Sequence, residues 1–219
     1  MNFFGHAAVA AHFTGDPPFV LGAMLPDLCN MIAARTPVVL HDAVSSGVRF
    51  HHATDVVFHD LPPFVHWSRR ASEQLLARGL GRGSARAIAH VGVELLIDEA
   101  MARSETARRV YISALSVGRA AEIEGVIDWR DEERERFAFL IDRLLERGIS
   151  AESPPDVLAE RLRRILAARP RLAFDAEKSA LVAEWIVETR PVVVGSVPAL
   201  TEALIAELRH SVAGPPAVG

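Results

Sequence analysis

The sequence predicts an all-α protein folded as a single multi-helix bundle. Apolar residues recur with helical spacing along nearly all of the 219 residues. No segment shows the apolar–polar alternation of a half-buried strand, and no Asn-Gly or Asp-Gly pair marks a hairpin. Half of the residues are hydrophobic and 24% are charged, which is typical of a chain that buries a core. We therefore expect one all-helical domain over residues 1–213 and a frayed tail at 214–219.

Prolines and capping residues divide the first half of the chain into helices. Asp16 precedes two prolines and is a good N-cap for a second helix, which Pro26 should kink or restart. Pro62-Pro63 should end a third helix, and Ser84 should cap the helix after the glycine-rich loop. We expect helices over about residues 3–12, 37–60 and 84–103. Another should include residues 21–27, and a further one should follow residue 60 and end near residue 78.

The second half continues as amphipathic helices. A charged helix should open at Asp128 and end near Gly148, and another should open at Ser153-Pro154. Pro191 and Pro198 should interrupt the last long stretch. The expected helices cover about residues 105–124, 128–148, 153–169 and 175–210. We interpret residues 1–103 as the half that carries a site and 104–213 as a packing or lid half.

Charge and cysteine content exclude several classes of protein. The formal net charge is −4 and no long basic block exists, so we expect no nucleic-acid partner. No run of 18 apolar residues predicts a membrane span, and the first six residues lack the basic region of a secretory signal. Cys29 is the only cysteine, which rules out a disulfide scaffold and suits the reducing cytoplasm. Walker, dinucleotide-binding and Gly-x-Ser-x-Gly motifs are also absent.

Eight of the nine histidines lie in the first 90 residues, and the segment 50–60 is the richest in them. At about 100° per residue, His52, Asp55 and His59 fall within about 60° on a helix. His51 and Asp55 are four residues apart and about 40° from each other. His51 and His59 are about 12 Å apart along the axis, too far for one ion unless the helix bends. The segment thus predicts one metal site or two neighbouring ones, and a purely water-facing surface is the alternative.

A second helix carries His90, Glu94 and Asp98 at every fourth residue among apolar neighbours. A carboxylate buried there must be paired or metal-bound, and pairing with an arginine is as good an explanation as a metal. Considered alone, His6 is a core histidine in an apolar helix, and Asp27 is a helix cap.

Four short segments follow one another in the first half of the chain: Met1–His6, Leu21–Asp27, Gly47–Asp55 and the Glu94–Asp98 helix. Their residues and their order resemble those of the acyl carrier protein phosphodiesterase family. That family opens with Met-Asn and a nearby histidine, and continues with a Leu-Gly segment ending in aspartate. A Gly-x-x-Leu-His-Arg-x-x-Asp helix and a helix with aspartates four apart follow. The resemblance covers about the first 103 residues and implies an all-helical bundle similar to the HD-domain metal phosphohydrolases.

The resemblance also carries residues over by position. His6, Asp27, His51 and Asp55 match the family's polar residues, while Glu94 and Asp98 fall where the family has two aspartates. The chain departs from the family in four places: His52 replaces an arginine, His59 an aspartate, Glu99 a histidine, and Leu-Pro-Asp the usual Gly-Asp. Leu-Pro-Asp with scattered histidines is also similar to the zinc-dependent phospholipase C group.

Together these patterns predict a cytoplasmic, metal-dependent phosphoesterase acting on a phosphodiester or phosphomonoester. A phosphopantetheinylated carrier protein is the substrate that the resemblance implies. Mixed histidine and aspartate ligands suit Mn²⁺, Fe²⁺ or Zn²⁺ better than Ca²⁺. The expected metal ligands are His6, Asp27, His51, Asp55, His90 and Asp98, and the expected catalytic residues are His52, His59 and Glu94. The alternative is an inactive helical binding or scaffold protein with a vestigial metal site.

Overall fold

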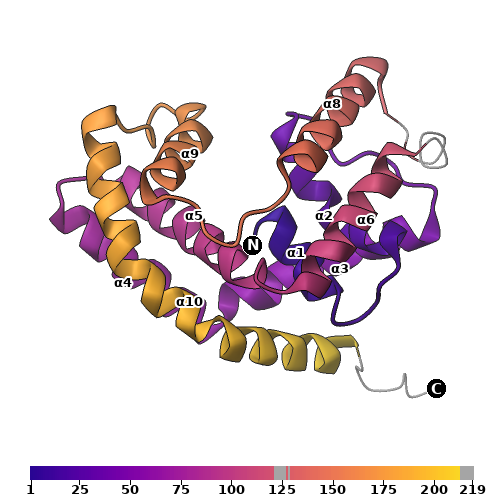
Figure 1. The fold of residues 1–219 in the computed structure, drawn as a ribbon, viewed down its shortest axis with the longest axis horizontal. Helices are drawn as coiled ribbons and strands as arrows, with labels where there is room; N and C mark the ends of the chain where they lie inside the picture. Colours follow the sequence, from indigo (N-terminus) through magenta and orange to yellow (C-terminus); the bar gives the residue numbers. More distant parts are fainter. Residues whose placement is uncertain (121–126, 128, 213–219) are drawn as a thin grey trace, which may run out of the picture. The chain divides into compact units, whose positions relative to one another are not determined.

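The computed structural model describes residues 1–120, 127 and 129–212. This part of the chain contains helices and no strand, which confirms the all-α prediction (Figure 1). An isolated antiparallel bridge joins Val39 and Ile127. The helices are α1 (Phe3–Ala10), α2 (Pro17–Met31), α3 (Asp42–Asp60), α4 (Pro62–Ala77), α5 (Arg82–Met101), α6 (Glu105–Arg119), α8 (Asp131–Arg147), α9 (Pro155–Ala167) and α10 (Ala176–Val212).

Several helix starts follow from local capping chemistry. The Asp16 carboxylate accepts a hydrogen bond from the backbone N–H of Phe19 at 3.2 Å, so α2 begins where the sequence predicts. Ser104 accepts from the N–H of Ala107 at 3.2 Å and caps α6 in the same way. Prolines occupy the first positions of α2, α4 and α9, where their missing N–H would have no helical partner.

Other predicted boundaries are wrong. Helix α3 begins at Asp42 and not at residue 37, because Val39 is extended and bridges to Ile127. Helix α6 ends at Arg119, since Ala120 is extended (φ −75°, ψ 142°); the rest of its predicted length, residues 121–124, lies outside the described residues, as does the predicted frayed tail.

The internal prolines do not end their helices. Helix α2 runs through Pro26, and α10 is continuous through Pro191 and Pro198. Each proline removes one helical hydrogen bond at a cost of about 3 kcal/mol. Buried neighbours on both sides, such as Leu25 and Leu28 in α2, keep these helices packed through the missing bond.

The contacts of the chain divide it into two compact units. Unit 1 comprises Met1–Phe58, Met101–Ile149 and Ala203–Gly219, and unit 2 comprises His59–Ala100 and Ser150–Glu202. Neither unit is continuous in sequence, and the division falls inside α3 and α10.

Unit 1 is built around α1, every residue of which is buried. Helix α1 packs on α2 and α6, and α6 in turn packs on α8. The ring of Phe4 meets Tyr111 of α6 edge-on at 5.3 Å between centroids. A helix buried on all sides cannot leave a polar side chain without a partner, which matters for His6.

The backbones of α2 and α3 touch at a pair of glycines in unit 1. A Cβ atom added to Gly22 would lie 2.1 Å from the carbonyl oxygen of Val44, and one added to Gly47 would lie 2.1 Å from that of Phe19. No side chain can occupy either position unless the helices move apart.

Unit 2 packs around the fully buried indole of Trp185. Its Nε1–H donates to Oε1 of Gln74 at 3.2 Å, which satisfies the one polar atom of the ring. Gly92 of α5 lies directly against this ring, since a Cβ there would be 2.8 Å from the indole.

A buried ion pair joins three segments of unit 2. Glu99 of α5 and Arg190 of α10, with side chains 7% and 12% exposed, lie 3.2 Å apart. The Glu99 carboxylate also accepts from the N–H of Ser153 at 2.8 Å, and Arg190 donates to the Ser153 carbonyl at 2.6 Å. Both backbone groups of Ser153, just before α9, are therefore held by the pair.

Helix α10 has the length and apolar composition that a membrane span requires. A third (33%) of its most apolar stretch is buried. One such helix is weak evidence for a span, so the absence of a span stays a prediction.

We predict that Arg190→Met lowers the free energy of unfolding by about 3 kcal/mol, because it leaves the Glu99 carboxylate buried without its cation. Urea denaturation followed by circular dichroism measures the change. The control is Arg69→Met, which breaks an ion pair with Glu73 whose side chains are 82% and 63% exposed and should leave the midpoint unchanged. Equal effects of the two substitutions would contradict this role of the buried pair.

Candidate metal-binding groups

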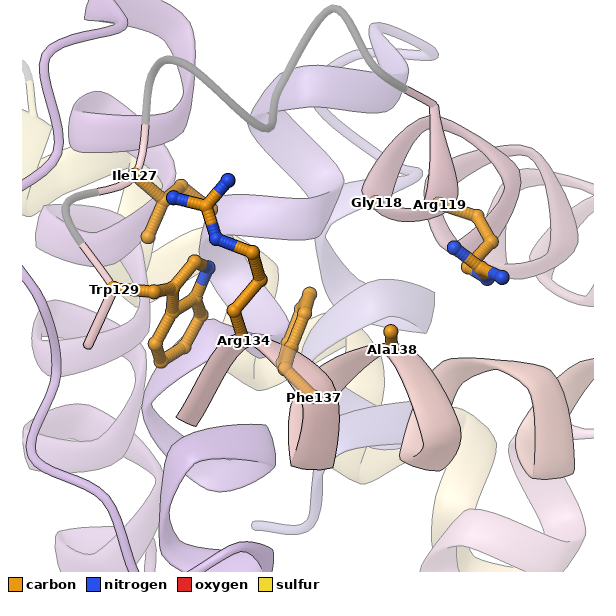
Figure 2. Close-up of a pocket in the computed structure, with 7 residues that line it drawn as sticks. All are labelled: Gly118, Arg119, Ile127, Trp129, Arg134, Phe137 and Ala138. Carbon is orange, nitrogen blue, oxygen red and sulfur yellow. The ribbon is translucent and has the colours of Figure 1, made fainter. Parts of the chain in front are cut away.

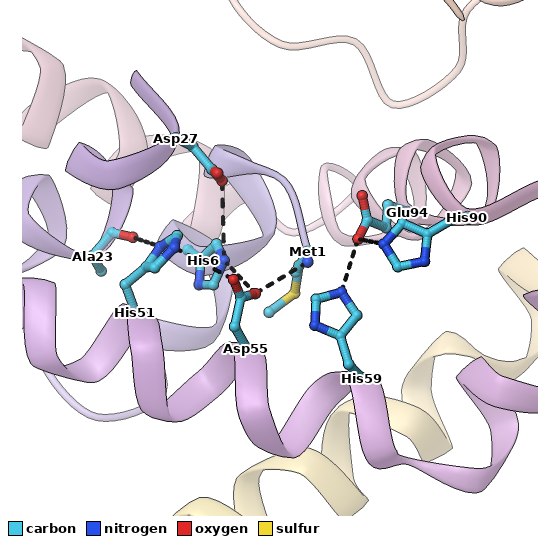
Figure 3. Close-up of polar contacts among 9 residues, drawn as sticks. All are labelled: Met1, His6, Ala23, Asp27, His51, Asp55, His59, His90 and Glu94. Atoms are coloured by element: carbon cyan, nitrogen blue, oxygen red, sulfur yellow. Dashed lines mark hydrogen bonds and ion pairs between the residues drawn. The ribbon is translucent and has the colours of Figure 1, made fainter. Parts of the chain in front are cut away.

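Three helices of unit 1 bring two histidines and two aspartates together: His6 of α1, Asp27 of α2, and His51 and Asp55 of α3 (Figure 3). Nε2 of His6 lies 3.1 Å from Oδ1 of Asp55 and 4.0 Å from Oδ2 of Asp27. Nε2 of His51 lies 3.5 Å from Oδ2 of Asp55. One ligand atom from each of His6, Asp27 and His51 lies within 4.8 Å of the others. These three residues offer ligand atoms to one point, and Asp55 lies beside both histidines. We call the four residues the unit 1 group.

His6 is fully buried, but it is not an ordinary core histidine. Its ring stacks on that of His51, with centroids 3.9 Å apart and an angle of 28° between the planes. Its Nε2 faces the carboxylates of Asp27 and Asp55. The apolar neighbours of His6 in the sequence do surround it in the fold. Its polar partners lie on α2 and α3, so the local sequence around His6 gives no sign of them.

The tautomer of His51 is set by a backbone group. Nδ1 lies 2.9 Å from the carbonyl oxygen of Ala23. A carbonyl only accepts hydrogen bonds, so Nδ1 carries the proton and Nε2 keeps its lone pair. Burial, helped by neighbouring His6, lowers the pKa of His51 to about 4. The ring is thus neutral at pH 7, with its lone pair toward the carboxylates.

The side chain of Asp55 is ionised at neutral pH. Burial alone would raise its pKa, but a hydrogen bond from His6 and the positive α-amino group of Met1, 3.2 Å away, hold the pKa below its usual range. Its side chain is 33% exposed and that of Asp27 is 25% exposed, while both histidines are nearly inaccessible. The carboxylates therefore form the solvent-facing side of the unit 1 group.

The spacing of these atoms fits a divalent metal ion. With bonds of about 2.1 Å, two ligand atoms of one ion lie about 3.0–4.2 Å apart in tetrahedral or octahedral geometry. The measured separations of 3.1, 3.5 and 4.0 Å fall in this range. The donor set of imidazole nitrogen and carboxylate oxygen suits Zn²⁺, Mn²⁺ or Fe²⁺.

A second group lies in unit 2, formed by His59 and by His90 and Glu94 of α5 (Figure 3). Oε1 of Glu94 is 3.2 Å from Nε2 of both histidines. The two imidazole rings stack at 5.1 Å, and Phe64 meets each of them edge-on at 5.3 Å. We call His59, His90 and Glu94 the unit 2 group.

The Glu94 carboxylate has two histidines as hydrogen-bond partners. Burial would raise its pKa, but hydrogen bonds from His59 and His90 hold the pKa well below its usual value. The arginine pairing weighed for this helix occurs one residue beyond Asp98, between Glu99 and Arg190.

Two of the expected site residues belong to neither group. His52 is exposed on α3, with its ring edge-on to His51 at 5.3 Å. Asp98 is buried on α5 and offers no ligand atom to either group. Cys29 is buried, and burial raises the pKa of its thiol to about 12, in agreement with its interpretation as a core residue.

Two contributors were missed by the sequence analysis. The carbonyl of Ala23 carries no residue-specific signal, but Gly22 beside it and Pro26 after it mark unusual backbone in α2. Phe64 is signalled only by its place just after the two prolines that open α4.

A small pocket lies elsewhere in unit 1, between α6, α8 and the residues that precede α8 (Figure 2). It has room for about one water molecule. None of the candidate ligands lines it. Its lining residues are Gly118, Arg119, Ile127, Trp129, Arg134, Phe137 and Ala138.

Comparisons with known proteins give no match: no family model, curated protein or solved structure is similar to the chain. The resemblance to the acyl carrier protein phosphodiesterases therefore rests on its short motifs alone.

We predict that the metal-free protein loses stability as the pH falls from 6.5 to about 4, the unperturbed and folded pKa values of His51. In this window the unfolded chain binds a proton that the folded chain excludes, so the stability present above pH 6.5 is lost progressively. The contribution is on the order of 3 kcal/mol. Asp55 has no part in this window, because its lowered pKa places its loss of stability at more acidic pH.

Urea denaturation at a series of pH values, with chelator present, measures this dependence. His51→Gln should flatten the profile between pH 6.5 and 4, whereas His12→Gln, at an exposed position of the same unit, should not. A profile that stays as steep in His51→Gln would show that another group is responsible.

Proposed function

We propose that the chain is a metal-dependent phosphoesterase with an HD-domain-like bundle, and that the unit 1 group holds its catalytic ion. The observation that carries the proposal is the convergence of His6, Asp27 and His51 from three helices, with Asp55 beside both histidines. The fixed tautomer of His51 adds support, because ordinary core packing does not require a lone pair aimed at carboxylates.

The ion would supply Lewis-acid stabilisation of a phosphoryl oxygen and activation of water. The residues of the chain would do the rest. His6 and His51 would bind as neutral ligands, and Asp27 and Asp55 would balance two positive charges. The partly exposed carboxylates leave one side of the group open for water and substrate, as a catalytic site requires.

The unit 2 group would take a second role in the same reaction class. Its two imidazoles and one carboxylate are also a metal-ligand set. Without an ion, His59, with a side chain 34% exposed, is placed to transfer protons while Glu94 orients it. His52 is exposed and is a further candidate for proton transfer.

The substrate would be a phosphodiester or phosphomonoester. A phosphopantetheinylated carrier protein in the cytoplasm is the substrate and setting implied by the family resemblance. Mn²⁺, Fe²⁺ and Zn²⁺ are the metals that the ligands favour.

One observation favours the alternative of an inactive binding or scaffold protein. Glu99 stands where the resembling family has a histidine, and it is committed to the buried pair with Arg190 and to Ser153. At a position where the resembling family has a histidine, Glu99 therefore stabilises the packing of three segments.

We predict that the purified protein contains one or two equivalents of a transition metal, one for each occupied group. Because the ligands of the unit 1 group converge only in the fold, added metal should raise the melting temperature. Elemental analysis and thermal melts measure both. His51→Ala should lose most of the metal-dependent increase, and His12→Ala should keep it. An unchanged increase in His51→Ala would exclude His51 as a ligand.

We also predict slow, Mn²⁺-stimulated hydrolysis of an activated aryl phosphodiester. Asp27→Asn should abolish it and leave the helical circular dichroism unchanged, because the substitution removes a charge and little volume. Asp16→Asn is the matched control in the same helix, since asparagine also caps helices, and should keep the rate. Rates are compared at matched metal loading. No turnover by the wild type with several divalent metals would favour the inactive scaffold; equal rates for Asp27→Asn and wild type would remove Asp27 from the site.

A further inference from the structure

The backbone contact between α2 and α3 lies one helical turn from the unit 1 group. Gly47 precedes His51 by four residues, and Gly22 is adjacent to Ala23, whose carbonyl meets His51. A Cβ on Gly47 would lie 2.1 Å from the Phe19 carbonyl oxygen and 2.7 Å from the backbone nitrogen of Ala23. Relief of such overlap to an ordinary van der Waals distance requires a movement of more than 1 Å.

Pro26 affects the same stretch of α2. It has no N–H to donate to the carbonyl of Gly22, four residues earlier, and its ring crowds that turn. Proline is a recognised cause of local opening in the helical ladder. The next carbonyl in this turn, that of Ala23, accepts the Nδ1–H of His51 at 2.9 Å.

We propose that Gly22 and Gly47 are positioning residues that hold the Ala23 carbonyl against Nδ1 of His51 and thereby keep Nε2 available as a ligand in the unit 1 group. The contact acts through His51 and touches neither metal nor substrate. This inference rests on the proposed metal-binding role of the unit 1 group, and it adds what sets the tautomer and direction of one ligand.

The geometry leaves little tolerance for change. A hydrogen bond of 2.9 Å is lost when its atoms move apart by more than about 0.6 Å, less than the displacement a methyl group at Gly47 imposes. The Ala23 carbonyl selects Nδ1–H, whereas the Asp55 carboxylate, 3.5 Å from Nε2, would favour a proton on Nε2 once that carbonyl moves away. A proton on Nε2 would block that atom as a ligand.

The experiment uses the full-length protein without metal at pH 7. Long-range ¹H–¹⁵N correlation spectra distinguish a protonated ring nitrogen from an unprotonated one and assign the tautomer of His51. Calorimetric titration with Zn²⁺ alone gives the affinity. The variants are Gly47→Ala and Gly22→Ala. Leu28→Ala, at a fully buried position of the same helix, controls for lost stability, and Gly195→Ala, where a Cβ meets nothing within 4 Å, controls for the glycine replacement itself.

In the wild type and both controls, His51 should be protonated at Nδ1. In Gly47→Ala and Gly22→Ala, the two tautomers should mix, and the Zn²⁺ affinity should fall about tenfold or more. Retention of the tautomer and the affinity in a folded glycine variant would overturn the inference. If neither variant folds, the wild-type protein still provides a test. A proton on Nε2 of His51 in the wild type would also overturn the inference. Hydrolysis is not measured, so a wild type that binds Zn²⁺ as expected but cleaves no phosphoester contradicts the proposed function alone.

Discussion

The close approach of α2 and α3 is the constraint on which the unit 1 group depends. Two of its four side chains come from α3 and one from α2, and the group closes only because the two backbones touch at Gly22 and Gly47. Larger side chains at this crossing would separate the helices by more than the length tolerance of a hydrogen bond. The same contact brings a backbone carbonyl to His51, which places the proton on Nδ1 and leaves Nε2 for its proposed role as a ligand.

Burial of ionisable groups is compensated differently in three places. In the unit 1 group, the stacked rings of His6 and His51 face partly exposed carboxylates. In the unit 2 group, one buried carboxylate oxygen is shared by two histidines. Between Glu99 and Arg190 the compensation is a conventional ion pair that also satisfies a loop backbone. Among the three, the first two arrangements bring imidazole nitrogens and carboxylate oxygens together, which separates candidate metal ligands from structural support.

Spacing along one helix was predictable from the sequence, and contacts between helices were not. The four-residue intervals His51–Asp55 and His90–Glu94 put each pair on one helical face, and both pairs occur. The same arithmetic also admitted His52 and Asp98, because a face spans about 60–80° and tertiary packing selects within it. Alone, His6 and Asp27 looked like a core residue and a cap, since their partners lie on other helices; only the order of the family-like motifs pointed to them.

The state of the one cysteine has a practical consequence. Cys29 is buried and its thiol pKa is raised to about 12, so almost none of it is thiolate at neutral pH, and the thiolate is the form that alkylating reagents attack. The native chain therefore behaves toward such reagents as though it had no cysteine. A cysteine introduced at an exposed helical position such as Val192, which is 55% accessible, would be the single reactive thiol, so spin labels and fluorophores can be attached at chosen points without altering the core.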